Sequence, residues 1–298
     1  MKDFCGLVSI VGRPNVGKST LLNRLIEQKI SITSRKSQTT RNNILGIKTK
    51  ENHQMVFIDT PGVHINASKV MNKVLNQSAL GAIEDADLII FMLQRNKINT
   101  LDELILERLK GVKTKKLCVI NKLDQVASKN SLLPVIEKLR SEYDFAEIIP
   151  VSAKTGKNIN ELENMICQNL PENNHLYDSD TKFLAKESFM ISEIIREKII
   201  RFLGEELPHE TYVQLQKLED KENIINIDAE IIVARESQKG IVVGKNGAKL
   251  KKIGEKARID LEKFFNKKVF LKTWVKTKKN WNNDSDFISS LGIGSLYD

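Results

Sequence analysis

One motif near the start of the sequence constrains the fold more than any other feature. It reads Gly12-Arg13-Pro14-Asn15-Val16-Gly17-Lys18-Ser19-Thr20 and fits the pattern G-x-x-x-x-G-K-[S/T]. An apolar run over residues 7–11 precedes it, and apolar residues at helical spacing follow at Leu21, Leu22, Leu25 and Ile26. A loop between a strand and a helix cradles phosphate, because backbone N–H groups and the lysine face the anion and the serine hydroxyl reaches Mg²⁺. This context disfavours the alternative, a glycine-rich turn without a ligand.

Strand-like and helix-like runs alternate through residues 1–170. A helix is expected over 18–29, and strand character is found over 7–11, 44–48, 55–58, 87–93, 117–121 and 147–151. The runs 44–48 and 55–58 flank a polar turn, which predicts a hairpin. The whole pattern predicts a mostly parallel sheet with helices on both faces, in which ligands bind at the carboxyl ends of the strands.

Two motifs at strand ends point to a guanine nucleotide. Asn121-Lys122-Leu123-Asp124 matches N-K-x-D, in which the aspartate accepts hydrogen bonds from guanine N1–H and the exocyclic amine. Adenine lacks both donors and would leave a buried carboxylate unpaired, so discrimination is strong. Ser152-Ala153-Lys154 ends the last strand and is typical of the loop that backs the base. Together with the phosphate loop, these motifs predict binding of GTP and GDP.

A third strand-end motif, Asp59-Thr60-Pro61-Gly62, matches D-x-x-G. In this pattern the aspartate holds Mg²⁺ through water and the glycine N–H contacts the γ-phosphate. The polar stretch 31–41 should carry the threonine that closes over Mg²⁺ and the γ-phosphate. Thr39 and Thr40 both qualify. We favour Thr40, which directly precedes Arg41, because related GTPases place this threonine in a T-R pair.

Hydrolysis is expected to be slow. Many GTPases carry glutamine after D-x-x-G to orient the attacking water, and here the residue is Val63. Catalysis would then come from Lys18, Thr40, the Gly62 N–H and Mg²⁺. Asn15 leaves two interpretations open. It lies in the form G-x-x-N-x-G-K-S, found in relatives that bind K⁺ beside the phosphates, where the cation replaces a missing arginine finger; alternatively, it only shapes the turn.

The second half of the chain follows a different pattern. Residues 171–181 are polar and aperiodic, which predicts a linker between a domain over 1–170 and a domain over 182–298. A helix is expected over 183–203, β-rich runs over 211–218 and 224–235, a basic helical stretch, and a strand over 269–275. The order is α-β-β-α-α-β, with a short glycine-containing loop between the last two helices.

That loop, Gly244-Lys245-Asn246-Gly247, fits G-x-x-G. In KH domains such a loop clamps the backbone of a four-nucleotide single strand, and glycines permit close approach of the phosphates. Candidate RNA contacts are Gly244, Lys245, Asn246, Gly247, Lys249, Lys251 and Lys252. A tight turn without RNA is the alternative. Trp274 and Trp281 could be core residues or base-stacking residues.

The charge distribution supports an anionic partner for the second domain. Residues 235–279 hold 15 Lys+Arg against 4 Asp+Glu, a surplus of +11, whereas the first 234 residues hold 32 against 31. A solvated lysine-rich surface is the alternative reading of this surplus. The three cysteines are widely spaced, so a reducing compartment is expected rather than a disulfide framework. No apolar run approaches the length of a membrane span. A signal peptide is not expected, because the first predicted strand begins close to the N-terminus.

The motifs taken in one order resemble the Era family of bacterial GTPases. They are G-R-P-N-V-G-K-S-T, Q-T-T-R, D-T-P-G, N-K-L-D, S-A-K and G-K-N-G, and the resemblance covers nearly the whole chain. It implies an α/β P-loop GTPase domain followed by an α+β KH domain of type II. It also implies binding of the 3′ end of 16S rRNA, with action in 16S rRNA maturation and 30S subunit assembly. A cytoplasmic monomer with peripheral association at the inner face of the membrane is expected.

Other classes of GTPase share parts of the pattern. A tRNA-modification GTPase needs a reactive cysteine near its end, and the last cysteine here is Cys167. A double-GTPase assembly factor would repeat the phosphate loop, which occurs once. A regulatory or signalling GTPase at the membrane surface would not need the KH segment. Binding of rRNA fragments would distinguish an rRNA-binding GTPase of the Era type from this class. Val63 also leaves open a scaffold that binds GTP without hydrolysing it.

Overall fold

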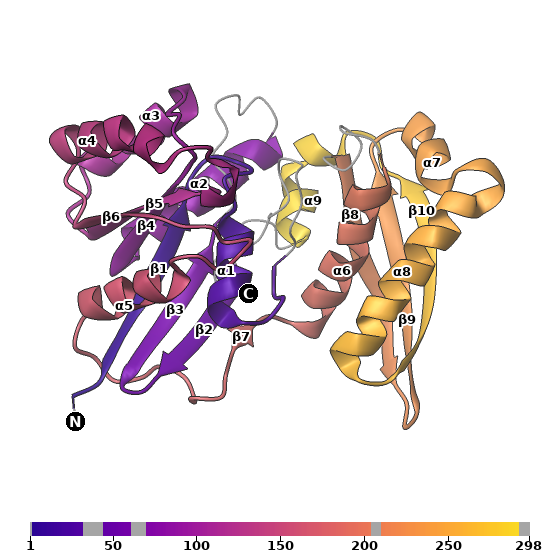
Figure 1. The fold of residues 1–298 in the computed structure, drawn as a ribbon. Helices are drawn as coiled ribbons and strands as arrows, with labels where there is room; N and C mark the ends of the chain where they lie inside the picture. The colour runs from indigo at the N-terminus through magenta and orange to yellow at the C-terminus, as the bar shows by residue number, and fades with distance from the viewer. Residues whose placement is uncertain (1, 32–43, 61–69, 204–209, 292–298) are drawn as a thin grey trace.

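The first lobe of the protein is built on a seven-stranded sheet (Figure 1). The computed structural model describes residues 2–31, 44–60, 70–203 and 210–291, and within them the strand order is β6-β5-β4-β1-β3-β2-β7. The strands are β1 (Phe4–Val11), β2 (Ile44–Lys50), β3 (His53–Asp59), β4 (Leu88–Gln94), β5 (Lys115–Asn121), β6 (Glu147–Pro150) and β7 (Phe183–Leu184). Only β2 runs antiparallel to its neighbours, β3 and β7, so the mostly parallel sheet and the hairpin are confirmed.

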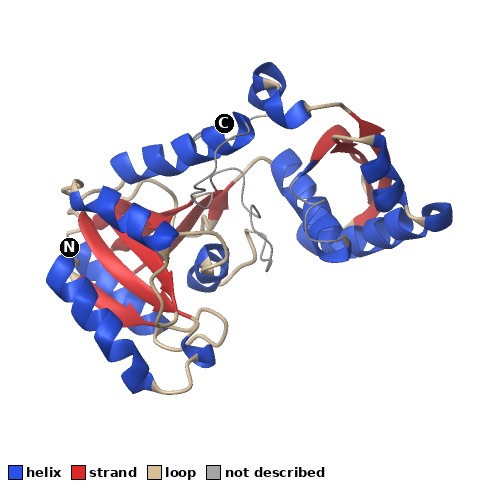
Figure 2. Cartoon of the chain, turned by 90° about the horizontal axis from the view of Figure 1, so that it is seen from above, coloured by secondary structure: helices blue, strands red, loops and turns tan. Residues whose placement is uncertain are grey.

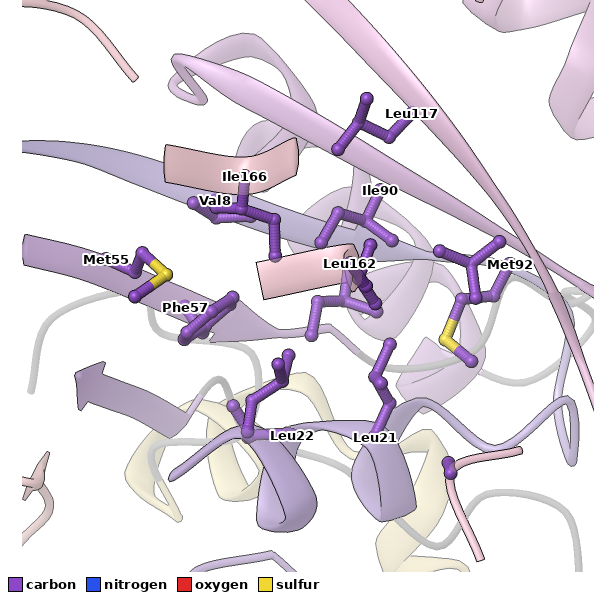
Figure 3. Close-up of a cluster of buried hydrophobic side chains, with 14 of the residues drawn as sticks. Val8, Leu21, Leu22, Met55, Phe57, Ile90, Met92, Leu117, Leu162 and Ile166 are labelled. Atoms are coloured by element: carbon purple, nitrogen blue, oxygen red, sulfur yellow. The ribbon is translucent and has the colours of Figure 1, made fainter. Parts of the chain in front are cut away.

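Helices cover both faces of this sheet (Figure 2). One face carries α1 (Lys18–Ile26) and α5 (Ile159–Asn169), and the other carries α2 (Val70–Glu84), α3 (Thr100–Lys110) and α4 (Leu133–Glu142). Figure 3 shows Leu21, Leu22 and Leu162 of the first pair of helices packed against Phe57 and Ile90 of the sheet. Each such side chain contributes roughly 1.5–3 kcal/mol by burial. The two cores fix the strand ends that carry the motifs.

Helix α1 is shorter than the sequence pattern predicted, because it ends at Ile26 rather than at residue 29. Glu27 follows with φ 58°, a left-handed conformation that stops the helix. The Asn23 side chain then holds the following turn, since its Oδ1 accepts from the N–H groups of Ile30 and Ser31 at 2.9 and 2.8 Å. The turn places Ser31 beside the end of β3.

The stretch expected to be a linker runs along the first sheet. Gln54 of β3 accepts hydrogen bonds from the N–H groups of Leu176 and Tyr177, and Ile47 of β2 donates to the carbonyl of Lys182. Strand β7 continues this contact, so the helix expected from residue 183 begins only at residue 187. The domain boundaries themselves stay a prediction.

The second lobe has a three-stranded sheet in the order β10-β9-β8, packed on helices. Its elements are α6 (Glu187–Phe202), β8 (Thr211–Asp220), β9 (Ile224–Val233), α7 (Glu236–Val243), α8 (Ala248–Phe265) and β10 (Lys268–Thr277). Strands β8 and β9 pair antiparallel, whereas β9 and β10 pair parallel. Ile195 of α6 and Ile253 of α8 lie in the buried core beneath the sheet. The predicted α-β-β-α-α-β order is therefore confirmed.

A C-terminal segment packs between the two lobes. After β10 come the short 3₁₀ helix η5 (Trp281–Asn283) and α9 (Ser285–Ser290), drawn in yellow in Figure 1. Trp281 is fully buried in an apolar cluster with Met71 and Leu75 of α2 and Ile288 of α9. Its Nε1 donates to the carbonyl of Glu210 at 3.1 Å. Trp281 is thus a core residue. Across the described ranges, no helix has both the length and the apolarity needed to cross a membrane.

Candidate nucleotide site and nucleic-acid interface

The phosphate loop lies between β1 and α1 and is anchored to the end of β5. Gly17 adopts φ 109°, and a Cβ there would collide with the Nδ2 atom of Asn121. That same Nδ2 donates to the carbonyl of Val16 at 2.8 Å. Asn15 lies exposed at the turn with φ 65°. Glycine is required at residue 17 by both backbone conformation and space.

Lys18 is buried inside the loop that it follows. Its Nζ donates to the carbonyls of Gly12 at 2.9 Å and Arg13 at 3.3 Å, and the residue is only 7% exposed. Burial lowers the pKa of Lys18 to about 8, since desolvation disfavours the charged form. An anion bound beside it would restore the charge. The Lys18 ammonium group therefore lies at the N-terminus of α1, where an anion would bind.

Two hydroxyl groups converge on the carboxylate at the end of β3. Ser19 Oγ donates to Asp59 Oδ2 at 2.8 Å, and Ser31 Oγ donates to the same oxygen at 2.7 Å. Asp59 is fully buried. Hydroxyl and carboxylate oxygens are the ligand atoms that Mg²⁺ prefers, so Ser19 and Asp59 fit this ion. Thr39, Thr40, Gly62 and Val63 lie outside the described residues.

The base end of the site is a cavity of about 740 Å³, within the usual size range for small-molecule sites. It is lined by Asn15, Gly17, Thr20, Gln94, Arg95, Asn121, Lys122, Asp124, Gln125, Ala153 and Lys154. Asp124 Oδ1 accepts from Ser152 Oγ at 2.6 Å, and Asn121 Oδ1 accepts from the Ala153 N–H at 3.0 Å. Lys122 Nζ donates to the Asn15 carbonyl at 2.7 Å. Three motifs that are far apart in the sequence thus meet around one cavity.

Several residues of this site were missed by sequence reasoning. Gln94 and Arg95 line the cavity at the end of β4, and their strand-end position was the signal that could have found them. Arg13 Nε pairs with Asp102 of α3 at 3.1 Å, and its Nη2 donates to Gln94 at 3.5 Å. Burial raises the pKa of the Asp102 carboxyl. Asp102 caps α3 together with Asn99, and its sequence pattern gives no sign of contact with the phosphate loop.

The glycine-containing loop of the second lobe joins α7 to α8 through three residues with positive φ. Gly244, Asn246 and Gly247 have φ of 71°, 52° and 76°. A Cβ at Gly244 would lie 2.8 Å from Lys249 Cγ, so a side chain is excluded by space as well as by conformation. A Cβ at Gly247 would meet no atom within 4 Å. The loop therefore presents open backbone at Gly247, where another chain can approach closely.

A second cavity, of about 410 Å³, lies beside this loop between α8 and β10. It is lined by Gly247, Leu250, Lys251, Gly254, Glu255, Arg258, Leu271 and Thr273. Lys245 and Lys249 are exposed, and they are close in the chain to Gly247 and Leu250 of the cavity lining. Lys252 Nζ lies 5.2 Å from the ring centre of Phe202 on α6. Trp274 Nε1 donates to Glu230 on the neighbouring strand at 2.9 Å. The structure places Gly247 and Lys251 at the cavity and Lys252 against α6.

Family profiles agree with this two-part architecture. A profile described as 50S ribosome-binding GTPase matches residues 7–122, and a profile described as KH domain matches residues 206–282. The fold and the site together define a P-loop GTPase that carries a KH domain.

Whole-chain relatives narrow this class. GTPase Era of Haemophilus influenzae is 46% identical over 292 residues, covering 98% of this chain and 97% of that protein. GTPase Era of Coxiella burnetii is 46% identical over 290 residues, covering 97% and 98%. The chain belongs to the Era family, and it is a GTPase that binds guanine nucleotides.

Solved structures of this family share the full fold. A crystal structure of Era in complex with MgGDPNP and nucleotides 1506–1542 of 16S ribosomal RNA has a TM-score of 0.94 at 36% identity, covering 97% of this chain and 99% of that chain. A variant of Aquifex aeolicus Era bound to GDP and AlF4⁻ has a TM-score of 0.93 at 36% identity, covering 98% and 99%. Both the α/β GTPase fold and the KH fold are thereby confirmed.

Proposed function

We propose that this GTPase hydrolyses GTP slowly and binds the single-stranded 3′ end of 16S rRNA through its KH domain, acting in 16S rRNA maturation and 30S subunit assembly. In this proposal residues 1–170 form the GTPase domain, 171–181 the linker and 182–298 the KH domain. The observation that carries the RNA half is the loop at Gly247, which is open, left-handed and adjacent to a cavity of about 410 Å³. A relative of nearly identical fold was crystallised with 16S rRNA nucleotides, which supports the choice of RNA.

At the base end of the nucleotide site, Asp124 and Asn121 would read guanine. Asp124 would exchange its hydrogen bond from Ser152 for two from the base, or share one oxygen between them. The Ala153–Lys154 loop would back the ring. Buried polar groups of this kind penalise any base that cannot pair with them, which makes the site selective for guanine over adenine.

At the phosphate end, residues 12–20 would surround the anion with backbone N–H groups, and Lys18 would place its charge on the phosphate oxygens. Ser19, Asp59 and Thr40 would hold Mg²⁺. Bound Mg²⁺ neutralises charge that develops on the transferred phosphoryl group. The Gly62 N–H and Thr40 would help to hold the attacking water, because Val63 cannot orient it by hydrogen bonding.

Asn15 carries the K⁺ part of the proposal. It is exposed at the tip of the phosphate loop, in a left-handed turn beside the cavity, and its amide oxygen is a suitable ligand for a monovalent cation. Hydrolysis should then run faster in potassium chloride than in sodium chloride at the same ionic strength. Equal rates would assign Asn15 to shaping the turn only.

In the RNA site, Gly244 and Gly247 would let a sugar-phosphate backbone approach the loop, and Lys245, Asn246, Lys249, Lys251 and Lys252 would supply charge and hydrogen bonds. The cavity between α8 and β10 would receive the bases. Because binding rests partly on phosphate contacts, affinity should fall as salt rises.

The experiment that tests this proposal is binding of a labelled oligonucleotide from the 3′ end of 16S rRNA. It is titrated in GDP and in a non-hydrolysable GTP analogue across a salt series, with a scrambled oligonucleotide as control. Tighter binding of the 16S sequence with the analogue would support a nucleotide-gated rRNA factor. Absence of binding in both states would contradict the RNA assignment and favour a signalling GTPase.

A further inference from the structure

The guanidinium of Arg24 on α1 binds the loop over residues 152–157, which lines the base end of the nucleotide cavity. Its Nε donates to the carbonyl oxygen of Ala153 at 3.2 Å, and its Nη2 donates to that of Lys154 at 2.7 Å. A guanidinium presents its donors in a rigid planar fork, so two neighbouring carbonyls bound to it are held in one geometry. Helix α1 and the base loop are thereby joined at two points.

These bonds close a circuit around the site. The Ala153 N–H donates to Asn121 Oδ1, and Asn121 Nδ2 donates to the carbonyl of Val16 in the phosphate loop. From Val16 the chain leads into α1, which carries Arg24 back to Ala153. Within the loop itself, the Gly156 N–H donates to the Ser152 carbonyl at 2.8 Å, which ties its two ends together. Loss of Arg24 would open the circuit at the base loop and leave the contacts of the phosphate loop in place.

Arg24 acts from outside the cavity. Ala153 and Lys154 line the cavity of about 740 Å³, and they also line a neighbouring hollow of about 490 Å³, to which Arg24 belongs. Its effect on a bound base must therefore pass through the two carbonyls that it holds. Its bonds do not involve Lys18, Ser19 or Asp59 at the phosphate end.

We infer that Arg24 is a positioning residue that sets the affinity of the site for guanine nucleotides without setting the rate of hydrolysis; this rests on the nucleotide site proposed above. Apparent affinity falls in proportion to the fraction of molecules in the binding-competent geometry. A base loop that keeps its geometry about a tenth of the time would weaken binding about tenfold. The Michaelis constant rises accordingly, and kcat is unchanged.

The test compares Arg24→Met, Arg24→Gln and Arg24→Lys with the unaltered protein. Lys157→Met is the matched control, because Lys157 is an exposed cation on the same loop and the substitution removes its charge alone. Three quantities are measured: the Kd for a fluorescent GDP analogue, KM and kcat for GTP, and hydrogen exchange at the amides of residues 153–156 in the nucleotide-free protein. Circular dichroism establishes that each variant is folded.

We expect Arg24→Met to raise Kd and KM about tenfold, to keep kcat within twofold, and to speed exchange at residues 153–156. Arg24→Lys should fall between Arg24→Met and the unaltered protein, because it keeps the charge and loses the fork. Lys157→Met should match the unaltered protein. Unchanged Kd in Arg24→Met, or in Arg24→Gln should Arg24→Met not fold, would overturn the inference, as would a lower kcat at unchanged KM. Failure of the unaltered protein to bind GDP would overturn the proposed site itself.

Discussion

The Nζ atom of Lys29 lies 2.6 Å from Oε2 of Glu197, and this ion pair joins the two lobes. Lys29 lies in the turn after α1, two residues before Ser31, whose hydroxyl donates to Asp59 at the nucleotide site. Glu197 on α6 is almost fully buried, and Asp260 of α8 lies 3.8 Å from the same Nζ. One lysine of the first lobe thus faces two carboxylates of the second, close to the residues that fit Mg²⁺.

Reversing the charge of Lys29 should loosen the contact between the lobes, although the Trp281 cluster still joins them. In Lys29→Glu, a third carboxylate would lie beside Glu197 and Asp260, which keep Lys198 and Arg201 as partners, and the buried Glu197 tolerates like charge poorly. We expect a larger radius of gyration by small-angle scattering and a loss of about 1–2 kcal/mol of stability, reduced by the exposure of Lys29. Binding of GDP should persist, because the cavity residues are untouched.

Lys50→Glu is the matched control for this prediction. Lys50 has a similar exposure, 44% against 51% for Lys29, and pairs with Glu163 inside the first lobe at 3.4 Å. This variant should keep the radius of gyration of the unaltered protein. An equal expansion in both variants would mean that the Lys29–Glu197 pair does not hold the lobes together.

Binding of GDP should take up a proton at Lys18 at mildly alkaline pH. The pKa of Lys18 is lowered to about 8 in the free protein, and the diphosphate raises it again by favouring the charged form. At pH 8 about half a proton should be taken up per GDP bound, falling towards zero at pH 6.5. Calorimetry in two buffers of different ionisation enthalpy measures this number. Equal uptake at both pH values would contradict the burial of a poised lysine.

In the nucleotide-free protein, the lowered pKa of Lys18 makes stability depend on pH. Because the folded pKa of Lys18 lies below its ordinary value of 10.5, the unfolded chain binds more protons between pH 8 and 10.5. The contribution of Lys18 to stability therefore rises as pH increases through this window. Its burial costs stability below pH 8, which is expected for a residue whose position serves ligand binding.

The motifs that meet at the nucleotide site could be predicted because parallel strands bring their carboxyl ends to one edge. Asp59 ends β3 and Asn121 ends β5, so a strand assignment alone was enough to place them together. The position of the G-x-x-G loop between two helices of the second lobe was likewise predicted from the order of the elements. Local pattern and a general rule of sheet topology carried these predictions.

Tertiary links could not be predicted in the same way. Arg24 is exposed, yet it holds a carbonyl 129 residues further along the chain, and nothing in its helical neighbourhood distinguishes it from a cation without tertiary contacts. Strand β7 has two residues and exists only because the edge of β2 accepts it. Trp281 was ambiguous between core and RNA contact because its burial depends on α2, which is more than 190 residues away.

Two substitutions of Gly247 distinguish the effect of backbone strain on RNA affinity from the effect of an added negative charge. Gly247→Ala should cost about 1 kcal/mol, because φ 76° is unfavourable for a side chain, and should otherwise fit, since no atom lies within 4 Å of a Cβ. Gly247→Asp adds the same strain and places a carboxylate at the rim of the cavity. We expect RNA affinity to fall at least tenfold more in Gly247→Asp than in Gly247→Ala, as measured by fluorescence anisotropy.

Binding of GDP serves as the internal control for these two variants, because the nucleotide cavity lies in the other lobe. Both should bind GDP with the affinity of the unaltered protein. RNA affinity that drops equally in the two variants would mean that strain, and not repulsion of phosphate, is responsible. Unchanged affinity in Gly247→Asp would show that RNA does not approach this loop.

The two tryptophans should differ strongly in their contribution to stability. Trp281 is fully buried between α2 and α9, so Trp281→Ala removes a large apolar contact and leaves a cavity, at a cost of about 3–5 kcal/mol. Trp274 is partly exposed on β10 and bonded to Glu230, so Trp274→Ala should cost about 1–2 kcal/mol. Urea unfolding followed by circular dichroism measures both.

Because Trp281 contacts Met71 and Leu75 of the first lobe, Trp281→Ala should also lower the cooperativity of unfolding between the lobes, whereas Trp274→Ala should not. Equal costs for the two variants would contradict the assignment of Trp281 to the core that joins the lobes.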